Sequence, residues 1–152
     1  QGLSKPSMYL VRARIDDETV SSPGEDVETS SGSIGPLSEI RFKDLTVESS
    51  NNLNEAVMES INSDPERHLG FYNRANNLSL KYHAFQLLPG IGNSKAIQMV
   101  KERGGSGWSS FEQIDNSCGI ESVKLLAERY LGEMKDPSES PSLLELLVRS
   151  EI

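Results

Sequence analysis

The chain has 152 residues, 36% of them hydrophobic and 25% charged, which suits one domain or two small subdomains with a shared core. Its 15 basic and 23 acidic side chains give a net charge of −8, which excludes a protein that coats nucleic acid through bulk positive charge. One Cys, two His and the lack of a long apolar run or a signal-peptide core predict a soluble, cytoplasmic protein without metal, cofactor or membrane contact.

The N-terminal part is predicted to be a small β structure. Residues 8–15 and 39–43 alternate between apolar and polar side chains, as half-buried strands do. The inward side chains would be Tyr9, Val11, Ala13, Ile15, Ile40 and Phe42. Short strands between the two segments are predicted at Val20, Val27 and Ile34. We take Gln1-Gly2 as a tag remnant outside the fold and predict a small sheet or partial barrel over residues 1–47.

Helical periodicity replaces alternation over residues 48–135, so an α+β fold is predicted in which the sheet packs on an all-α bundle. The first helices are expected after Ser49 or Ser50, with Leu53, Val57 and Ile61 inward, then from Asp64-Pro65 to Asn76, and then from about Ser79 with Leu80, Ala84, Leu87 and Leu88 inward. The later ones are expected over 93–103 with Ala96, Ile97 and Val100 inward, after a Ser109–Glu112 capping box, and after Gly119 with Leu126 and Tyr130 inward.

The C-terminal residues 136–152 are predicted to be a linker and a separate amphipathic helix. Pro and Ser dominate the linker, and a Ser142–Glu145 capping box opens the helix. Its apolar stripe would be Leu143, Leu146, Leu147 and Ile152. This stripe either binds a partner or folds back on its own domain.

The most informative segment is residues 87–96, a full match to the helix-hairpin-helix motif. Pro89 ends the preceding helix, and Gly90 and Gly92 permit a tight turn. Ile91 between them is predicted to plug the core. Because neither Gly has a side chain, a phosphate can approach the backbone N–H groups of the turn and the positive end of the next helix. Such a site binds the nucleic-acid backbone with little sequence information.

The distribution of charge and of basic residues points to the same region. Residues 1–80 sum to −6, residues 81–135 to +1 and residues 136–152 to −3. Ser94 stands where the common motif has a basic residue, and Lys95 is the nearest substitute. The predicted nucleic-acid contacts are Gly90, Ile91, Gly92, Asn93, Ser94, Lys95, Lys101 and Arg103. The competing interpretation is a turn that packs two helices and binds nothing.

Residues 118–122 are interpreted as a second, degenerate hairpin. It keeps Gly119, but Glu121 stands where a phosphate would bind, so we assign this copy to structure. Lys124 and Arg129 remain candidate backbone contacts on its flank. Tandem hairpins of this kind would form one compact helical unit.

Four segments carry a family likeness: residues 40–46, 71–75, 80–92 and 108–114. Over about residues 8–135 the chain resembles the archaeal domain-of-unknown-function 655 family of predicted RNA-binding proteins. The resemblance implies an OB-like β part on a helix-hairpin-helix bundle, no known catalytic activity, and a place in translation or ribosome-linked RNA metabolism.

We therefore predict a non-catalytic nucleic-acid-binding protein, with RNA favoured over DNA. The first alternative is a protein-interaction adaptor that uses its acidic surface or residues 143–152, and the second is a DNA-binding or repair accessory protein. A DNA glycosylase would combine the hairpin with an Asp such as Asp115, but the chain is too short for a base-flipping pocket. His68 and His83 lie in no catalytic motif, so no enzyme is predicted.

Overall fold

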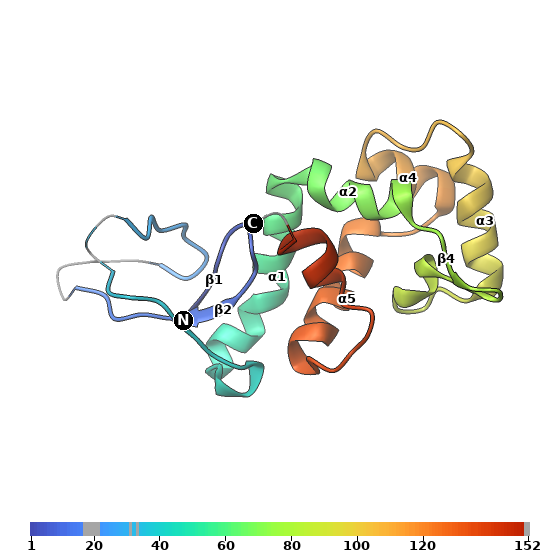
Figure 1. Ribbon diagram of the computed structural model, residues 1–152. Coiled ribbons are helices and arrows are strands. Elements are labelled where there is room, and N and C mark those ends of the chain that lie inside the picture. Colours follow the sequence, from blue (N-terminus) through green and yellow to red (C-terminus); the bar gives the residue numbers. More distant parts are fainter. Residues whose placement is uncertain (17–21, 31, 33, 151–152) are drawn as a thin grey trace.

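The fold is an α+β arrangement in which a small sheet lies at one end of a helical body, as predicted (Figure 1). The computed structural model describes residues 1–16, 22–30, 32 and 34–150. Its strands are β1 (Gly2–Leu3), β2 (Leu10–Arg12), β3 (Ser38–Glu39), β4 (Asn77–Ser79) and β5 (Tyr82–His83). Its α-helices are α1 (Val47–Ser63), α2 (Pro65–Arg74), α3 (Asn93–Arg103), α4 (Phe111–Cys118) and α5 (Ser122–Lys135), with 3₁₀-helices at Phe42–Asp44 and Ala84–Leu87 and a π-helical turn at Leu144–Val148.

The N-terminal sheet is antiparallel with strand order β1-β2-β3, and it is smaller than predicted. Gly2 pairs with Val11 and Val11 pairs with Glu39, so Gly2 belongs to the sheet, contrary to the prediction that Gln1-Gly2 lies outside the fold. An isolated bridge joins Ile15 to Ile34. Val27 is exposed outside any strand, and the strand predicted at Val20 falls outside the described residues.

The predicted inward face of β2 is only partly buried. Met8 and Leu10 are buried, Val11 is half-buried and Ile15 is 53% exposed. Met8 has φ of 54°, a left-handed conformation that breaks the extended backbone before the strand. The three strands therefore form a short open sheet, and the likeness to an OB fold stays a prediction.

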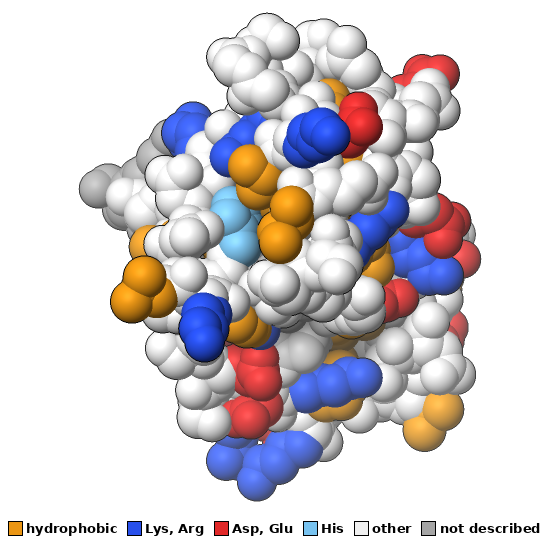
Figure 2. Space-filling view, turned by 90° about the vertical axis from the view of Figure 1, so that its right-hand side faces the viewer, with side chains coloured by type: hydrophobic (Ala, Val, Ile, Leu, Met, Phe, Trp, Pro, Cys, Tyr) orange, Lys and Arg blue, Asp and Glu red, His pale blue; other side chains and the backbone are white. Residues whose placement is uncertain are grey.

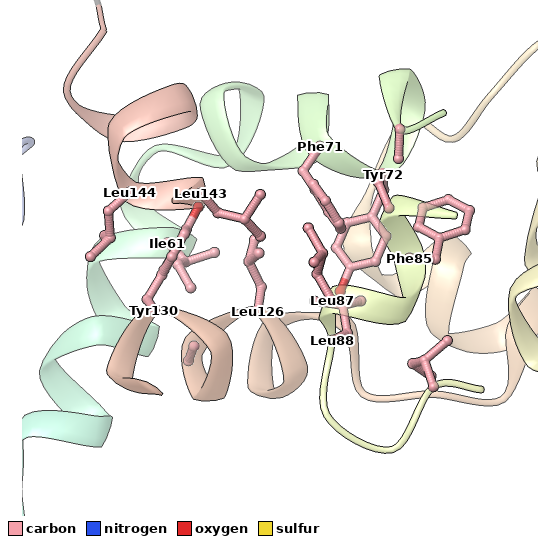
Figure 3. Close-up of a cluster of buried hydrophobic side chains, with 14 of the residues drawn as sticks. Ile61, Phe71, Tyr72, Phe85, Leu87, Leu88, Leu126, Tyr130, Leu143 and Leu144 are labelled. Atoms are coloured by element: carbon pink, nitrogen blue, oxygen red, sulfur yellow. The ribbon is translucent and has the colours of Figure 1, made fainter. Parts of the chain in front are cut away.

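The main core lies between α1, α2, α5 and the C-terminal turn (Figure 3). The predicted inward residues of α1 and α5 are buried there, among them Ile61, Leu126 and Tyr130. The buried Tyr130 hydroxyl lies 2.7 Å from His68 Nδ1. Burial lowers the pKa of His68 to about 4, because the charged imidazolium loses its hydration there. This buried pair makes the core sensitive to acid.

Residues 79–88, predicted to be a helix, instead form the β4–β5 hairpin and a 3₁₀-helix. The 3₁₀-helix is capped by His83, whose Nδ1 accepts from Phe85 N and whose backbone N donates to Gln86 Oε1. Leu80 at the hairpin tip is 98% exposed, while Leu87 and Leu88 are buried. The apolar spacing that mimicked a helix thus comes from two different elements.

The C-terminal residues 142–150 fold back on the helical body. Glu133 of α5 accepts hydrogen bonds from the backbone N of Leu143 and Leu144 at 2.9 and 3.0 Å, and both side chains are buried. Val148 is buried as well, whereas Leu146 is 61% exposed and Ile152 lies outside the described residues. Of the predicted stripe, the chain's own core thus covers Leu143 and part of Leu147, and the other buried residues of the turn, Leu144 and Val148, lie outside that stripe.

Arg149 ties this C-terminal turn to the N-terminal sheet. Its Nε donates to Ser7 O and a second guanidinium nitrogen donates to Met8 O, at 2.9 and 3.0 Å. Its guanidinium lies 3.9 Å from the centre of the Tyr9 ring. The predicted segments 1–47, 48–135 and 136–152 are therefore in direct contact, and their division into separate units stays a prediction. No described helix has the length and apolar character needed to cross a membrane.

Candidate nucleic-acid interface

The predicted hairpin turn connects the 3₁₀-helix Ala84–Leu87 to α3 and is open to solvent. Gly90 has φ of 77°, a conformation that favours glycine, and Ile91 N donates to Leu88 O at 3.2 Å to close the turn. A Cβ built on Gly90 or Gly92 would meet no atom within 4 Å. Ile91 is 9% exposed and plugs the core between them, as predicted. The backbone of this turn is therefore accessible.

The first amides of α3 are free for a ligand. Gly92 is the N-cap residue, and its carbonyl accepts from Ala96 N at 3.0 Å, so the N–H groups of residues 92–95 precede the first intrahelical bond. No described side chain caps them. Asn93 and Ser94 are exposed beside these amides. A helix start of this kind favours an anion through its N–H groups and its dipole.

Lys95, predicted to contact phosphate, makes a hydrogen bond inside the protein. Its Nζ donates to the Cys118 carbonyl at the end of α4, and its side chain is half-buried. The hydrogen bond satisfies a carbonyl that α4 leaves without an intrahelical partner. Lys95 therefore joins α3 to α4, and its contact with phosphate stays a prediction.

Arg103, also predicted as a contact, is anchored inside the helical body. It donates to Tyr72 O and Ala75 O at 3.1 and 2.8 Å, and it stacks 5.3 Å from the centre of the Phe85 ring. Lys101, two residues before Arg103, is exposed. Of the three basic residues predicted for α3, Lys101 is thus the one that remains fully available to solvent.

Two hollows of different charge flank the turn. The first is lined by the turn itself and by Glu128, Arg129 and Glu139, and Arg129 forms an ion pair with Glu139 at 2.8 Å. The second lies between the β4–β5 hairpin and α3; it is lined by Lys81, Tyr82, His83, Asn93, Ile97 and Arg103, among others. The charged side chains that line the second hollow, Lys81 and Arg103, are both basic, so this hollow favours an anion.

Basic residues outnumber acidic ones in the segment that contains the second hollow. Residues 76–111 contain four basic side chains and one acidic side chain, whereas the remainder of the chain contains 11 basic and 22 acidic ones. Figure 2 shows this end of the molecule, where a histidine lies beside hydrophobic side chains and both basic and acidic side chains are present on the same face. The acidic total of the chain therefore hides one cationic region.

The second hairpin is present between α4 and α5, and its turn is filled. Gly119 caps α4 with φ of 67°. Asp115 Oδ1 accepts from Ser122 N at 2.8 Å, so a side chain of the protein occupies the start of α5. Glu121 forms an ion pair with Lys124 at 3.6 Å. This copy matches the predicted structural role, and Asp115, the residue that a glycosylase would need, serves as a cap.

Sequence reasoning missed the second hollow because it placed residues 79–88 in one helix. Tyr82 and Leu80 would then have been ordinary helix positions. The signal that could have found it is the Asn76-Asn77 pair followed by short polar and apolar alternation, which is typical of a hairpin. Among the described residues, no group of three or more His, Cys, Asp or Glu side chains could hold a metal ion.

A small antiparallel sheet on a body of short helices, with one open and one filled glycine turn, defines a distinct class of α+β protein. The sequence profile of the family described as "Protein of unknown function (DUF655)" matches residues 1–143. The chain therefore belongs to the DUF655 family, as the resemblance indicated.

Two comparisons agree with this family. An uncharacterised protein of Methanocaldococcus jannaschii is 26% identical over 97 residues, which is 64% of this chain and 45% of the relative. The chain thus spans less than half the length of that relative. The crystal structure of a DUF655 protein from Archaeoglobus fulgidus has the same fold, with a TM-score of 0.81 at 22% identity over 93% of this chain and 82% of the other.

Proposed function

We propose that the protein is a non-catalytic nucleic-acid-binding protein that holds phosphates on the turn before α3. The observation that supports this proposal is the open turn. A Cβ built on Gly90 or Gly92 would meet no atom within 4 Å, and no described side chain caps the first amides of α3. The ligands would be backbone N–H groups, with the hydroxyl of Ser94 and the amide of Asn93 beside them. The exposed Lys101 adds local positive charge.

RNA is the nucleic acid we favour, in translation or ribosome-linked metabolism, because that is the setting that the family resemblance implies. DNA, including a role as a repair accessory, is the alternative ligand. Binding by this chain alone is expected to be weak. With Lys95 and Arg103 held in internal hydrogen bonds, few cations remain to release counterions from the nucleic acid.

A protein-interaction adaptor is the second candidate function. The exposed apolar side chains favour it, since Leu80 is 98% exposed and Ile97 is 61% exposed on neighbouring elements. The acidic remainder of the chain would suit a basic partner. Salt separates phosphate binding from a contact through these apolar side chains, because phosphate binding weakens with added salt and an apolar contact does not.

The test measures the fluorescence anisotropy of a labelled single-stranded RNA of about ten nucleotides at several salt concentrations. Gly92→Val places a branched side chain over the amides at a position with φ of −92° and open space, so it blocks the turn without strain. Gly105→Val is the matched control, at an exposed glycine with equally open surroundings.

We expect Gly92→Val to weaken RNA binding by about tenfold, the loss of one or two charge-assisted hydrogen bonds, while Gly105→Val binds like the wild type. Both variants should keep the wild-type circular dichroism spectrum. Equal affinity of Gly92→Val and the wild type would show that the turn does not hold the phosphate.

A further inference from the structure

The hollow between the β4–β5 hairpin and α3 has the size and the chemistry of a ligand groove. Its volume is about 630 Å³, which lies within the range of small-molecule pockets. One wall is the hairpin, with Leu80 and Tyr82, and the other is α3, with Ile97. Tyr82 is 40% exposed and Ile97 is 61% exposed, so neither side chain is buried in the core.

The aromatic wall of this groove is held in place. The Tyr82 hydroxyl donates to Gln86 O at 3.2 Å, which ties the ring to the 3₁₀-helix below it. A ring fixed in this way offers an apolar face without the entropy cost of ordering a free side chain. Aromatic faces of this kind stack on nucleobases of any sequence.

Polar groups that suit a base edge line the same groove. Asn77 and Asn93 are exposed, and their side-chain amides make no hydrogen bond with the described residues. An amide presents both a donor and an acceptor, as base edges do. Lys81 lies on the lining as well and supplies positive charge for an adjoining phosphate.

We propose that this groove takes an unpaired nucleobase, stacked against Tyr82, while the neighbouring phosphate sits on the turn before α3. Asn93 connects the two places, because it is the first residue of α3 and also lines the groove. This inference rests on the proposed function and adds that the ligand is single-stranded. A duplex keeps its bases stacked inside and cannot fill the groove.

Charge favours a nucleic acid over a protein as the occupant. The charged side chains on the lining of the groove, Lys81 and Arg103, are both basic, in a chain whose total charge is −8. A polyanion with flat apolar bases complements both the cations and the apolar walls. A purely apolar helix would complement the walls alone.

The test compares three ligands of equal length: a single-stranded RNA, the same strand without bases, and the RNA annealed into a duplex. Wild type should bind the single strand at least about fivefold more tightly than the abasic strand, which carries the same phosphates. Tyr82→Ala should abolish this preference, and Tyr82→Phe, which keeps the ring, should retain it. Ile97→Ser tests the opposite wall from an exposed helix position and should reduce the preference too.

The outcomes separate the two proposals. If Gly92→Val weakens single and abasic strands by the same factor while Tyr82→Ala weakens only the strand with bases, both proposals stand. The proposal of a base groove is wrong if the wild type binds the single-stranded RNA and the abasic strand equally. It is also wrong if folded Tyr82→Ala and Ile97→Ser keep the wild-type preference. Either result leaves the proposed phosphate site intact. If the wild type binds none of the strands, the proposed phosphate site is wrong, and so is the base groove that rests on it.

Discussion

The two glycine turns of the helical body differ in what occupies the helix start that follows each of them. Before α3, Gly92 is the cap residue, and no described side chain reaches the first amides. Before α5, Asp115 Oδ1 accepts from Ser122 N at 2.8 Å. A helix start that is satisfied within the protein has a structural role, whereas one left open by glycines is available to an anion.

Lys95 extends this comparison, because it joins the two turns. Lys95 lies in α3, the helix that follows the open turn, and its Nζ donates to the Cys118 carbonyl beside the filled turn. The one basic residue near the motif thus stabilises the second turn. Under the proposed function, phosphate recognition at the first turn would rest on backbone amides and would need no cluster of cations.

The largest expected effect is a loss of folding stability at acidic pH, and it limits the pH range in which the two turns can be compared. The pKa of His68 is about 4 in the folded state and about 6.5 when the chain is unfolded, so between these values the unfolded state binds the extra proton. Stability should therefore fall as the pH drops from about 6.5 to 4, by about 3 kcal/mol from this residue. Urea unfolding at several pH values measures the loss.

A flat stability profile over that range would mean that His68 is protonated in the fold or is accessible to water. Binding experiments on either turn belong above pH 6.5, where the contribution of His68 is fully present.

The next largest effect contrasts the two glycines. Gly119→Val should destabilise the protein by about 2 kcal/mol, because φ is 67° there and a branched side chain is strained in the left-handed region. Gly92→Val should change stability by less than about 0.5 kcal/mol, since its backbone is extended and its surroundings are open. Thermal or urea unfolding compares the stability of the two variants. Similar losses of stability in both would show that the two glycine positions do not differ in backbone strain.

Removal of the internal cap should have a smaller effect. Asp115→Ala leaves the N–H of the buried Ser122 without its acceptor, which costs about 1.5 kcal/mol. Asp115→Asn keeps an oxygen in place and should recover most of this stability. Urea unfolding gives both values, and RNA affinity should be the same in each folded variant. A variant that gains RNA affinity would show that the second turn also receives phosphate once it is emptied.

The smallest effect is expected at Lys95. Lys95→Met keeps the aliphatic stem but leaves the Cys118 carbonyl without its donor, a loss of about 1 kcal/mol for this half-buried contact. The dependence of RNA affinity on salt should not change. A slope reduced by about one in a plot of log affinity against log salt would instead identify Lys95 as a phosphate ligand.

Much of the helical body could be predicted from the sequence, because strong local signals define it. The starts of α2 at Pro65 and of α3 at Asn93 and the end of α3 at Arg103 are as predicted, whereas α2 ends at Arg74, before the predicted Asn76. Capping was less accurate: α1 begins after Thr46, three residues before the predicted Ser49, and α4 begins after Ser110, next to the predicted Ser109. Local signals place an element well and its end less well.

The errors arose where distant packing decides. Leu80, Ala84 and Leu87 have helical spacing, but Leu80 lies on an exposed hairpin while the other two belong to a 3₁₀-helix. Ile97 was expected inward, yet Met99 is the buried residue of that turn of α3. The role of Lys95 required knowing that α3 ends up beside Cys118, which no local pattern encodes.

The most direct test of the open turn is an NMR titration of the wild-type protein with single-stranded RNA above pH 6.5. Amide resonances of Gly92, Asn93 and Ser94 should shift progressively with RNA and return towards their free positions at high salt. The amides of Gly119 and Ser122 in the filled turn should stay unchanged. Shifts confined to the filled turn, or none at either turn, would contradict the proposed phosphate site.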